Sequence, residues 1–205
     1  KNLQIINKLK RKNIPVVLAD RGIQDSDFDF VTTNNFEGSR EITQHLINRG
    51  HEKIAFLSNK VYSTERLRYD GFISKMKELK IVQDPSITII DKSAFNVNRY
   101  LNHAHKILKN RGKFTAVYAG HDRIALLFYA AAKNLGLNVP EDFSLVGYDN
   151  MPLTTVSLTT MHQPIYEMGQ ESIKLIVARL NDRSIKTKNV ILKSNLIKRK
   201  SVKSI

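Results

Sequence analysis

The sequence predicts an α/β fold in which parallel strands alternate with helices. The clearest sign is the stretch at residues 114–150, which has the pattern of a strand, a helix and a second strand. The apolar runs at 114–119 and 143–148 suit strands that are buried on both faces of a sheet. The Ala- and Leu-rich segment 123–135 between them favours a helix. We therefore expect a sheet of parallel strands with crossover helices.

Turn and capping residues mark the ends of these elements. Asp122 stands directly before the helical segment and is the predicted N-cap. Gly136 stands where a left-handed C-cap is expected, and Pro140 cannot continue the helix.

Polar residues follow both predicted strands at their carboxyl ends. His121 and Asp122 follow the first strand, and Asp149 and Asn150 follow the second. Open α/β sheets bind ligands outside the carboxyl ends of their strands, which makes these residues candidates for ligand contact. The same residue types are common in turns for local reasons, and the pattern alone leaves both interpretations open.

The same alternation runs through the rest of the chain. Further helices are predicted at 3–9, 41–48, 65–80, 99–108 and 165–180, and further strands at 16–18, 30–33, 53–57, 87–90, 158–163 and 190–197. A turn is expected at 34–38. The apolar residues of the helix at 165–180 are expected to face inward: Ile165, Met168, Ile173, Ile176 and Val177.

Composition is that of a globular protein. The chain has 205 residues, of which 41% are hydrophobic and 25% charged, and this length can bury a substantial core. The absence of cysteine excludes disulfides and thiolate chemistry. No apolar run approaches the roughly 18 residues that span a bilayer. The first residues lack the apolar core of a signal peptide.

The chain is strongly basic. Its 33 Lys and Arg against 19 Asp and Glu leave a net charge of +14. Such an excess can mark nucleic-acid binding, but the basic residues are dispersed, with mild clusters at 8–12, 106–113 and 186–203. No helix-turn-helix or zinc pattern accompanies them. A generally Lys-rich surface and a patch that meets DNA or a partner both remain open.

The sequence carries no motif of a known catalytic site. It has no phosphate-cradling Gly-rich loop, no Gly-x-Ser-x-Gly elbow and no His-Glu-x-x-His. The neighbours His121 and Asp122 do not suit a catalytic dyad, because adjacent side chains seldom hydrogen-bond in the required geometry. We expect no enzymatic activity, no metal and no cofactor.

An ordered set of motifs resembles a known family. AGHDRIAL at 119–126 is followed by VPEDFSLVGYDN at 139–150, LTTMHQP at 158–164 and EMGQ at 167–170. Upstream stand IPVVLADR, NNFEG, HLINRGHEKIAFLS and ERLRYDGF, at 14–21, 34–38, 45–58 and 65–72. No single motif is decisive, but the ordered set resembles the effector-binding core of the LacI/GalR family of transcription regulators.

The resemblance implies a two-lobe, periplasmic-binding-protein-like fold, in which each lobe is a mainly parallel sheet flanked by helices and several crossovers join the lobes. Residues 1–58 with 163–188 would form the N-terminal lobe, and 59–162 with 189–205 the C-terminal lobe. The family's first strands and its DNA-binding headpiece have no counterpart in this sequence. We therefore expect the N-terminal lobe to be incomplete.

The resemblance also implies a ligand site in the cleft between the lobes. Arg68 would grip ligand hydroxyls or a carboxylate with its planar fork of donors, and Asp149 would accept hydrogen bonds. His121 would add another polar contact, and Phe95 would stack on the ligand, with a core position as the alternative. Asn34 stands where the family more often has Asp, and simple turn chemistry is its alternative.

The function implied is that of a cytoplasmic transcription regulator, a repressor that binds a sugar or sugar derivative. Operator DNA would be bound by a headpiece outside this chain, as a homodimer with no membrane association. Candidate dimer contacts are the apolar segments 124–132 and 153–156. The alternative is a soluble sugar-binding protein of a transport system. The ending VILKSNLIKRKS resembles the regulators and favours the first interpretation.

Overall fold

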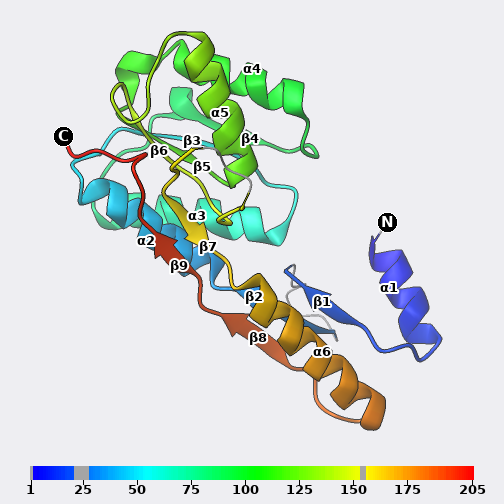
Figure 1. The fold of residues 1–205 in the computed structure, drawn as a ribbon. Coiled ribbons are helices and arrows are strands. Elements are labelled where there is room, and N and C mark those ends of the chain that lie inside the picture. The colour runs from blue at the N-terminus through cyan, green and yellow to red at the C-terminus, as the bar shows by residue number, and fades with distance from the viewer. Residues whose placement is uncertain (1, 21–27, 153–155) are drawn as a thin grey trace. The chain divides into compact units, whose positions relative to one another are not determined.

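A computed structural model describes residues 2–20, 28–152 and 156–205. Most of the expected dimer segment at 153–156 lies outside these described residues. The chain forms two compact units (Figure 1). Unit 1 comprises Lys1–Asn34 and Pro164–Lys193, and unit 2 comprises Asn35–Gln163 and Ser194–Ile205.

Unit 2 is built on a parallel sheet with the strand order β4-β3-β5-β6. Its strands are β3 (Ile54–Asn59), β4 (Thr88–Asp91), β5 (Ala116–Ala119) and β6 (Ser144–Val146). One face packs against α4 (Val97–Leu108) and α5 (Asp122–Asn134), and the other against α2 (Asn35–Ile47) and α3 (Ser63–Glu78). Short 3₁₀ turns η1 and η2 occupy Pro85–Ile87 and Arg111–Lys113. Helices on both faces confirm the α/β prediction for this unit.

Two apolar cores lie on opposite faces of this sheet. Because side chains alternate along a strand, Ala55 and Leu57 of β3 join the core under α4 and α5, whereas Ile54 and Phe56 join the core under α2 and α3. Phe56 stacks on Phe72 of α3 with ring centroids 4.8 Å apart. The continuous apolar runs of the sequence are explained by this burial on both faces.

Unit 2 also contains the antiparallel pair of β7 (Thr160–His162) and β9 (Asn195–Ile197). The residues after β9 run along β6, where Leu145 N donates to Ser201 O at 2.8 Å. Buried His51 fixes the same segment, because its Nε2 lies 3.0 Å from Lys203 O.

Unit 1 has a smaller parallel sheet with the order β1-β2-β8. Its elements are α1 (Asn2–Arg11), β1 (Val17–Ala19), β2 (Asp29–Thr33), α6 (Ile165–Asn181) and β8 (Asn189–Leu192). Helix α6 packs on β1 and β2 over a core of Val31, Met168 and Leu175. Arg179 ties the last turn of α6 to buried Asp29, with Nε and Oδ2 2.5 Å apart.

These units differ from the predicted lobes. Residues 35–58 belong to unit 2, because β3 is an inner strand of its sheet and α2 packs on α3. The single strand predicted at 190–197 is two strands, β8 in unit 1 and β9 in unit 2. The chain passes from one unit to the other between them, at Lys193 and Ser194.

Two local predictions are wrong at helix starts. The turn expected at 34–38 is mostly helical, because α2 already begins at Asn35. His121, not Asp122, is the N-cap of α5: its backbone is extended and its ring nitrogen accepts from Ile124 N. The left-handed conformation expected at Gly136 is confirmed by its φ of +72°.

The predicted inward face of α6 is only partly correct. Met168 is buried, but Ile165, Ile173 and Val177 are 67%, 64% and 48% exposed. Among the described residues, the three-stranded sheet covers only a narrow stripe of the helix, and Leu175 completes that stripe. None of the described helices has the length and apolarity needed to cross a membrane.

The apolar helix expected to form a dimer contact serves its own unit. In α5, the side chains of Ile124, Ala125, Phe128, Ala131 and Ala132 are buried in the core under this helix. The apolar character of 124–132 is therefore explained by packing within unit 2.

Candidate functional site

The carboxyl ends of the parallel strands in unit 2 meet at one edge of the sheet, which we call the carboxyl edge. Asn59 ends β3 and Asp91 ends β4. His121 follows β5, and Asp149 follows β6 at two residues beyond Gly147. Helices α3 and α5 start just after β3 and β5. The parallel topology thus gathers polar side chains that are far apart in the sequence, at the position where such sheets bind ligands.

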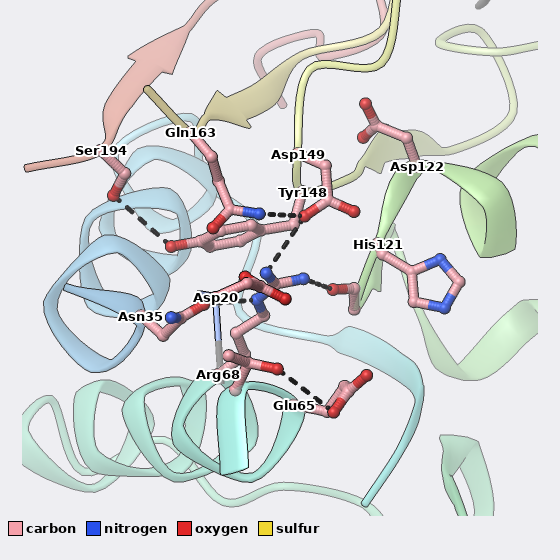
Figure 2. A network of polar contacts seen from close by, with 12 residues as sticks. Asp20, Asn35, Glu65, Arg68, His121, Asp122, Tyr148, Asp149, Gln163 and Ser194 are labelled. Carbon is pink, nitrogen blue, oxygen red and sulfur yellow. Dashed lines mark hydrogen bonds and ion pairs between the residues drawn. The ribbon is translucent and has the colours of Figure 1, made fainter. Parts of the chain in front are cut away.

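Arg68 is the centre of this edge. Its Nε donates to Asn35 Oδ1 at 2.8 Å, its Nη1 to Gly120 O at 2.9 Å, and its Nη2 lies 3.1 Å from Asp149 Oδ1. The guanidinium carbon lies 3.8 Å from the centre of the Tyr148 ring, and Figure 2 shows the two groups facing each other. Arg68 is only 4% exposed, and these contacts hold its fork of donors in one orientation.

Asp149 is held by a turn with unusual backbone geometry. Asp149 and Asn150 have φ values of +110° and +55°, a region that residues other than glycine rarely adopt. Asp149 N donates to Met161 O at 2.8 Å, and the Gln163 amide donates to Asp149 Oδ1 at 2.7 Å (Figure 2). The Asp149 side chain remains 24% exposed, so a carboxylate is presented at the edge.

Asp122 stabilises this turn instead of facing a ligand. Its carboxylate is fully buried and accepts from Thr160 Oγ1 at 2.7 Å and from Met151 N at 2.8 Å. Burial raises the pKa of Asp122, although these hydrogen bonds and the charge of Arg199 act in the opposite direction. Asp122 was predicted to be a candidate for ligand contact. In the structure its buried carboxylate instead supports the turn that contains Asp149.

Asn150 has a similar supporting position. Its Nδ2 lies 3.1 Å from His162 Nδ1, and its Oδ1 accepts from Arg199 Nη2 at 2.7 Å. Both ends of its amide are thus engaged by neighbouring segments of unit 2.

His121 and Phe95 lie together at the edge. Their ring centroids are 5.5 Å apart, and Phe95 also stacks on Tyr100 at 5.0 Å. Burial, together with the charges of Arg68 and Arg123, lowers the pKa of His121 to about 3. The imidazole is therefore neutral at physiological pH. Phe95 packs against the core and is half-buried, as its alternative core role predicted, and its stacking on a ligand stays a prediction.

Several polar groups at the edge were missed by the sequence reasoning. The oxygens Ser58 Oγ, Asn59 Oδ1 and Tyr100 Oη are buried, and the Tyr100 hydroxyl lies near the Asn59 side chain. Ser58 and Asn59 stand at the end of an apolar strand, just as His121 does. The same rule that selected His121 could have found them.

Asn34 is the one predicted site residue that is assigned to unit 1. It belongs to unit 1, where its backbone N donates to Leu192 O at 3.0 Å. Its neighbour Asn35 belongs to unit 2 and contacts Arg68. Unit 2 therefore brings together four of the five predicted residues: Arg68, Asp149, His121 and Phe95.

The carboxyl edge presents a hydrogen-bond donor, an acceptor and an aromatic ring. It offers the guanidinium of Arg68, the carboxylate of Asp149 and the ring of Phe95. Within the described ranges, no group of three or more His, Cys, Asp or Glu side chains could hold a metal ion. These groups suit a ligand with several hydroxyls and an apolar face.

Comparison with known protein families identifies the fold. Residues 43–202 match the family model of the periplasmic binding protein-like domain. The chain belongs to this family. The match covers both the sheet of unit 2 and α6 of unit 1.

Curated relatives are transcription repressors. The chain is 31% identical over 196 residues to the HTH-type transcriptional repressor PurR of Mannheimia succiniciproducens, covering 94% of this chain and 58% of that protein. It is 34% identical over 197 residues to PurR of Serratia proteamaculans, covering 93% and 57%. The chain thus spans less than two thirds of the length of these relatives.

Solved structures of transcription regulators have the same fold as this chain. A LacI family regulator from Enterococcus faecium with bound ribose has a TM-score of 0.86 and 27% identity, covering 98% of this chain and 75% of that one. A LacI-type regulator from Bacillus cereus has a TM-score of 0.88 and 25% identity, covering 100% and 74%. The predicted α/β fold and the resemblance to the LacI/GalR effector-binding core are confirmed.

Proposed function

We propose that this chain senses a small polar effector, a sugar or a sugar derivative, as part of a cytoplasmic transcription repressor. In the whole protein, a DNA-binding headpiece would contact the operator and two copies would associate as a homodimer. The kinship with LacI-family regulators supports this proposal, as do relatives of this core with bound ribose and cellobiose.

The observation that carries the proposal is the pair formed by Arg68 and Asp149. Arginine only donates hydrogen bonds, and an ionised aspartate only accepts them. Their polar atoms lie 3.1 Å apart, so a ligand with neighbouring hydroxyls can accept from one side chain and donate to the other. Phe95, half-buried beside His121, supplies an apolar surface for a sugar ring.

Regulation would follow from differential affinity. An effector changes DNA binding only if it binds one conformation of the protein more tightly than another. Whether this effector releases the repressor from DNA or strengthens its binding depends on which conformation it prefers. The geometry of unit 2 is compatible with both.

The experiment is a binding screen of the full chain against sugars, sugar derivatives, purines and amino acids, by thermal shift followed by calorimetry. A ligand at about 100 times its Kd should stabilise the chain by roughly 2.7 kcal/mol. Arg68→Lys and Asp149→Asn should each weaken the interaction with any ligand that binds. Arg66→Lys is the matched control, because Arg66 lies on the same helix but is exposed.

The outcomes separate the alternatives. Equal binding by the two site variants and the control would show that the site is elsewhere. A folded chain that binds no small molecule would contradict effector sensing. For the whole protein, an effector that binds without altering DNA affinity would favour the transport alternative.

A further inference from the structure

Glu65 is a buried carboxylate at the carboxyl edge that the site described above does not use. It lies in the first turn of α3, three residues before Arg68, so the two side chains project from the same face of the helix. Glu65 is 9% exposed, and burial to this degree is uncommon for a glutamate without a partner. Figure 2 shows its carboxylate beside Arg68, on the side of that arginine where His121 lies.

The protein itself satisfies only part of this carboxylate. Thr64 Oγ1 donates to Glu65 Oε2 at 3.3 Å, which is long for a hydrogen bond between two oxygens. Within the part of the chain that the structure describes, Oε1 accepts no hydrogen bond, and no basic side chain forms an ion pair with Glu65. Burial of an ionised carboxylate is unfavourable unless donors or a cation are supplied. Oε1 therefore has room for a donor from outside the chain.

The basic side chains of the edge bind other groups. The guanidinium nitrogens of Arg68 have the partners given above, and Glu65 is not among them. Arg123 is exposed, and its guanidinium carbon lies 4.3 Å from the centre of the Phe95 ring. His121 is neutral, because burial and the charges of both arginines lower its pKa to about 3. Among the described residues, none of these three side chains serves as a counter-ion of Glu65.

The formal charges of the edge are balanced without a charged ligand. Two ion pairs each combine one arginine with one aspartate: Arg68 with Asp149, and Arg99 with Asp91. Burial raises the pKa of Asp122, and the positive charge of Arg199 acts against this rise. Glu65 and Arg123 stand outside these pairs and carry opposite charges. A ligand with a net charge would disturb this balance, whereas an uncharged ligand would preserve it.

The carboxylate belongs to the same part of the edge as the aromatic side chains. Burial raises the pKa of Tyr100 to about 12, and the negative charges of Asp91 and Glu65 add to this effect. Glu65 is therefore within electrostatic range of Tyr100, whose ring stacks on Phe95 with centroids 5.0 Å apart. The proposed function places a sugar ring on Phe95. The hydroxyls of such a ring are the donors that the unused oxygen of Glu65 can accept from.

We propose that Glu65 determines ligand specificity by accepting a hydrogen bond from a hydroxyl of an uncharged sugar. This inference rests on the proposed function and narrows its ligand class. Arg68 and Asp149 would bind one set of hydroxyls, and Glu65 would bind another. Because a carboxylate only accepts hydrogen bonds, it selects against a phosphate or carboxylate group at the same position, which presents negatively charged acceptors.

The test measures matched ligands by calorimetry on the full chain. Ribose is compared with ribose 5-phosphate, and glucose with glucose 6-phosphate and gluconate. We expect an uncharged sugar to bind about tenfold or more tightly than its anionic derivatives, in the range of one hydrogen bond to a charged group.

Variants isolate the role of Glu65. Glu65→Gln keeps the shape of the side chain and removes its negative charge, so most of the preference for the uncharged sugar should be lost. Glu78→Gln is the matched control, because it makes the same change at the other end of α3, where the side chain is 46% exposed. It should leave the preference unchanged to within about twofold.

A purely structural role of Glu65 is tested on the same variants. A carboxylate in the first turn of a helix interacts favourably with the helix dipole, which predicts a loss of stability in Glu65→Gln. Urea unfolding measures that loss. A less stable variant that keeps the full preference for the uncharged sugar would show a structural role alone and would overturn the inference.

Two further results distinguish failure of this inference from failure of the proposed function. If an uncharged sugar binds and depends on Arg68 and Asp149, but its anionic derivative binds as tightly, the proposed function stands and the role of Glu65 is refuted. If no sugar of either class binds to the folded chain, the proposed function fails together with this inference.

Discussion

The two units of this protein use the same elements with different degrees of burial. Unit 2 has helices on both faces of a parallel sheet and two apolar cores to which the fully buried strands β3, β5 and β6 contribute. Among the described residues of unit 1, the apolar core cluster contains Val31, Met168 and Leu175, and several apolar side chains of α6 are exposed. The difference shows that an apolar pattern specifies a helix in both units. How many of the apolar side chains of that helix are buried depends on how much sheet packs against it.

The buried polar contacts have different roles in the two units. In unit 2 the buried polar groups support the carboxyl edge, where Arg68 and Asp149 are presented. In unit 1 the buried carboxylate of Asp29 joins α6 to β2 through Arg179 and accepts from Lys188 N. We expect the network of unit 2 to matter mainly for ligand binding and that of unit 1 mainly for stability.

The largest expected effect is in the core of unit 2. Phe72→Ala removes a fully buried ring that stacks on Phe56 and contacts Tyr118, and it should cost roughly 3–5 kcal/mol of unfolding free energy. Urea unfolding followed by far-UV circular dichroism measures the loss. A cost below about 1 kcal/mol would show that unit 2 is no better packed than unit 1.

A second prediction concerns acid sensitivity in unit 1. Burial alone would raise the pKa of Asp29, but the hydrogen bonds from Arg179 and Lys188 N outweigh it and hold the pKa below its ordinary value of 3.8. The ionised carboxylate therefore stabilises the fold above that value, and this stabilisation is lost as pH falls through the lowered pKa. Asp29→Asn should destabilise the protein at neutral pH, and the difference from the wild type should vanish in strong acid.

Asp122 in unit 2 should show the opposite sign. Its pKa is raised by burial, so its ionised form is less favourable in the folded state. The contribution of Asp122 to the free energy of unfolding should therefore increase as pH falls through the raised pKa towards the ordinary value of 3.8. Asp122→Asn should remove this increase in thermal scans between neutral pH and pH 4. Parallel pH profiles for the Asp29 and Asp122 variants would contradict the comparison.

The smallest expected effect is on the exposed face of α6. Ile173 is 64% exposed, and Ile173→Ser should change the unfolding free energy by no more than about 0.5 kcal/mol. Chemical unfolding together with sedimentation measures stability and association in the same sample. A larger loss, or a change in sedimentation, would show that this face is covered in solution.

Much of the fold could be predicted from local pattern. The apolar runs located the strands, and the Ala- and Leu-rich segment located α5 to within one residue at each end. The cap of α5 was misassigned because His121 and Asp122 are both able to accept from the first turn. The inward face of α6 was misassigned because its apolar residues are distributed around the helix, and only contact with a sheet decides which are buried.

The sequence by itself determined the alternation of strands and helices, and motif order determined the family, because hydrophobic periodicity and turn chemistry are local properties. Only the tertiary structure decided that β3 belongs to unit 2, that β8 and β9 belong to different sheets, and that Asp122 supports the turn presented by Asp149. These outcomes depend on contacts between residues distant in the chain. Arg68 illustrates both levels: its motif marked it as a candidate, but its partners Asn35, Gly120 and Asp149 come from separate segments that only the folded sheet brings together.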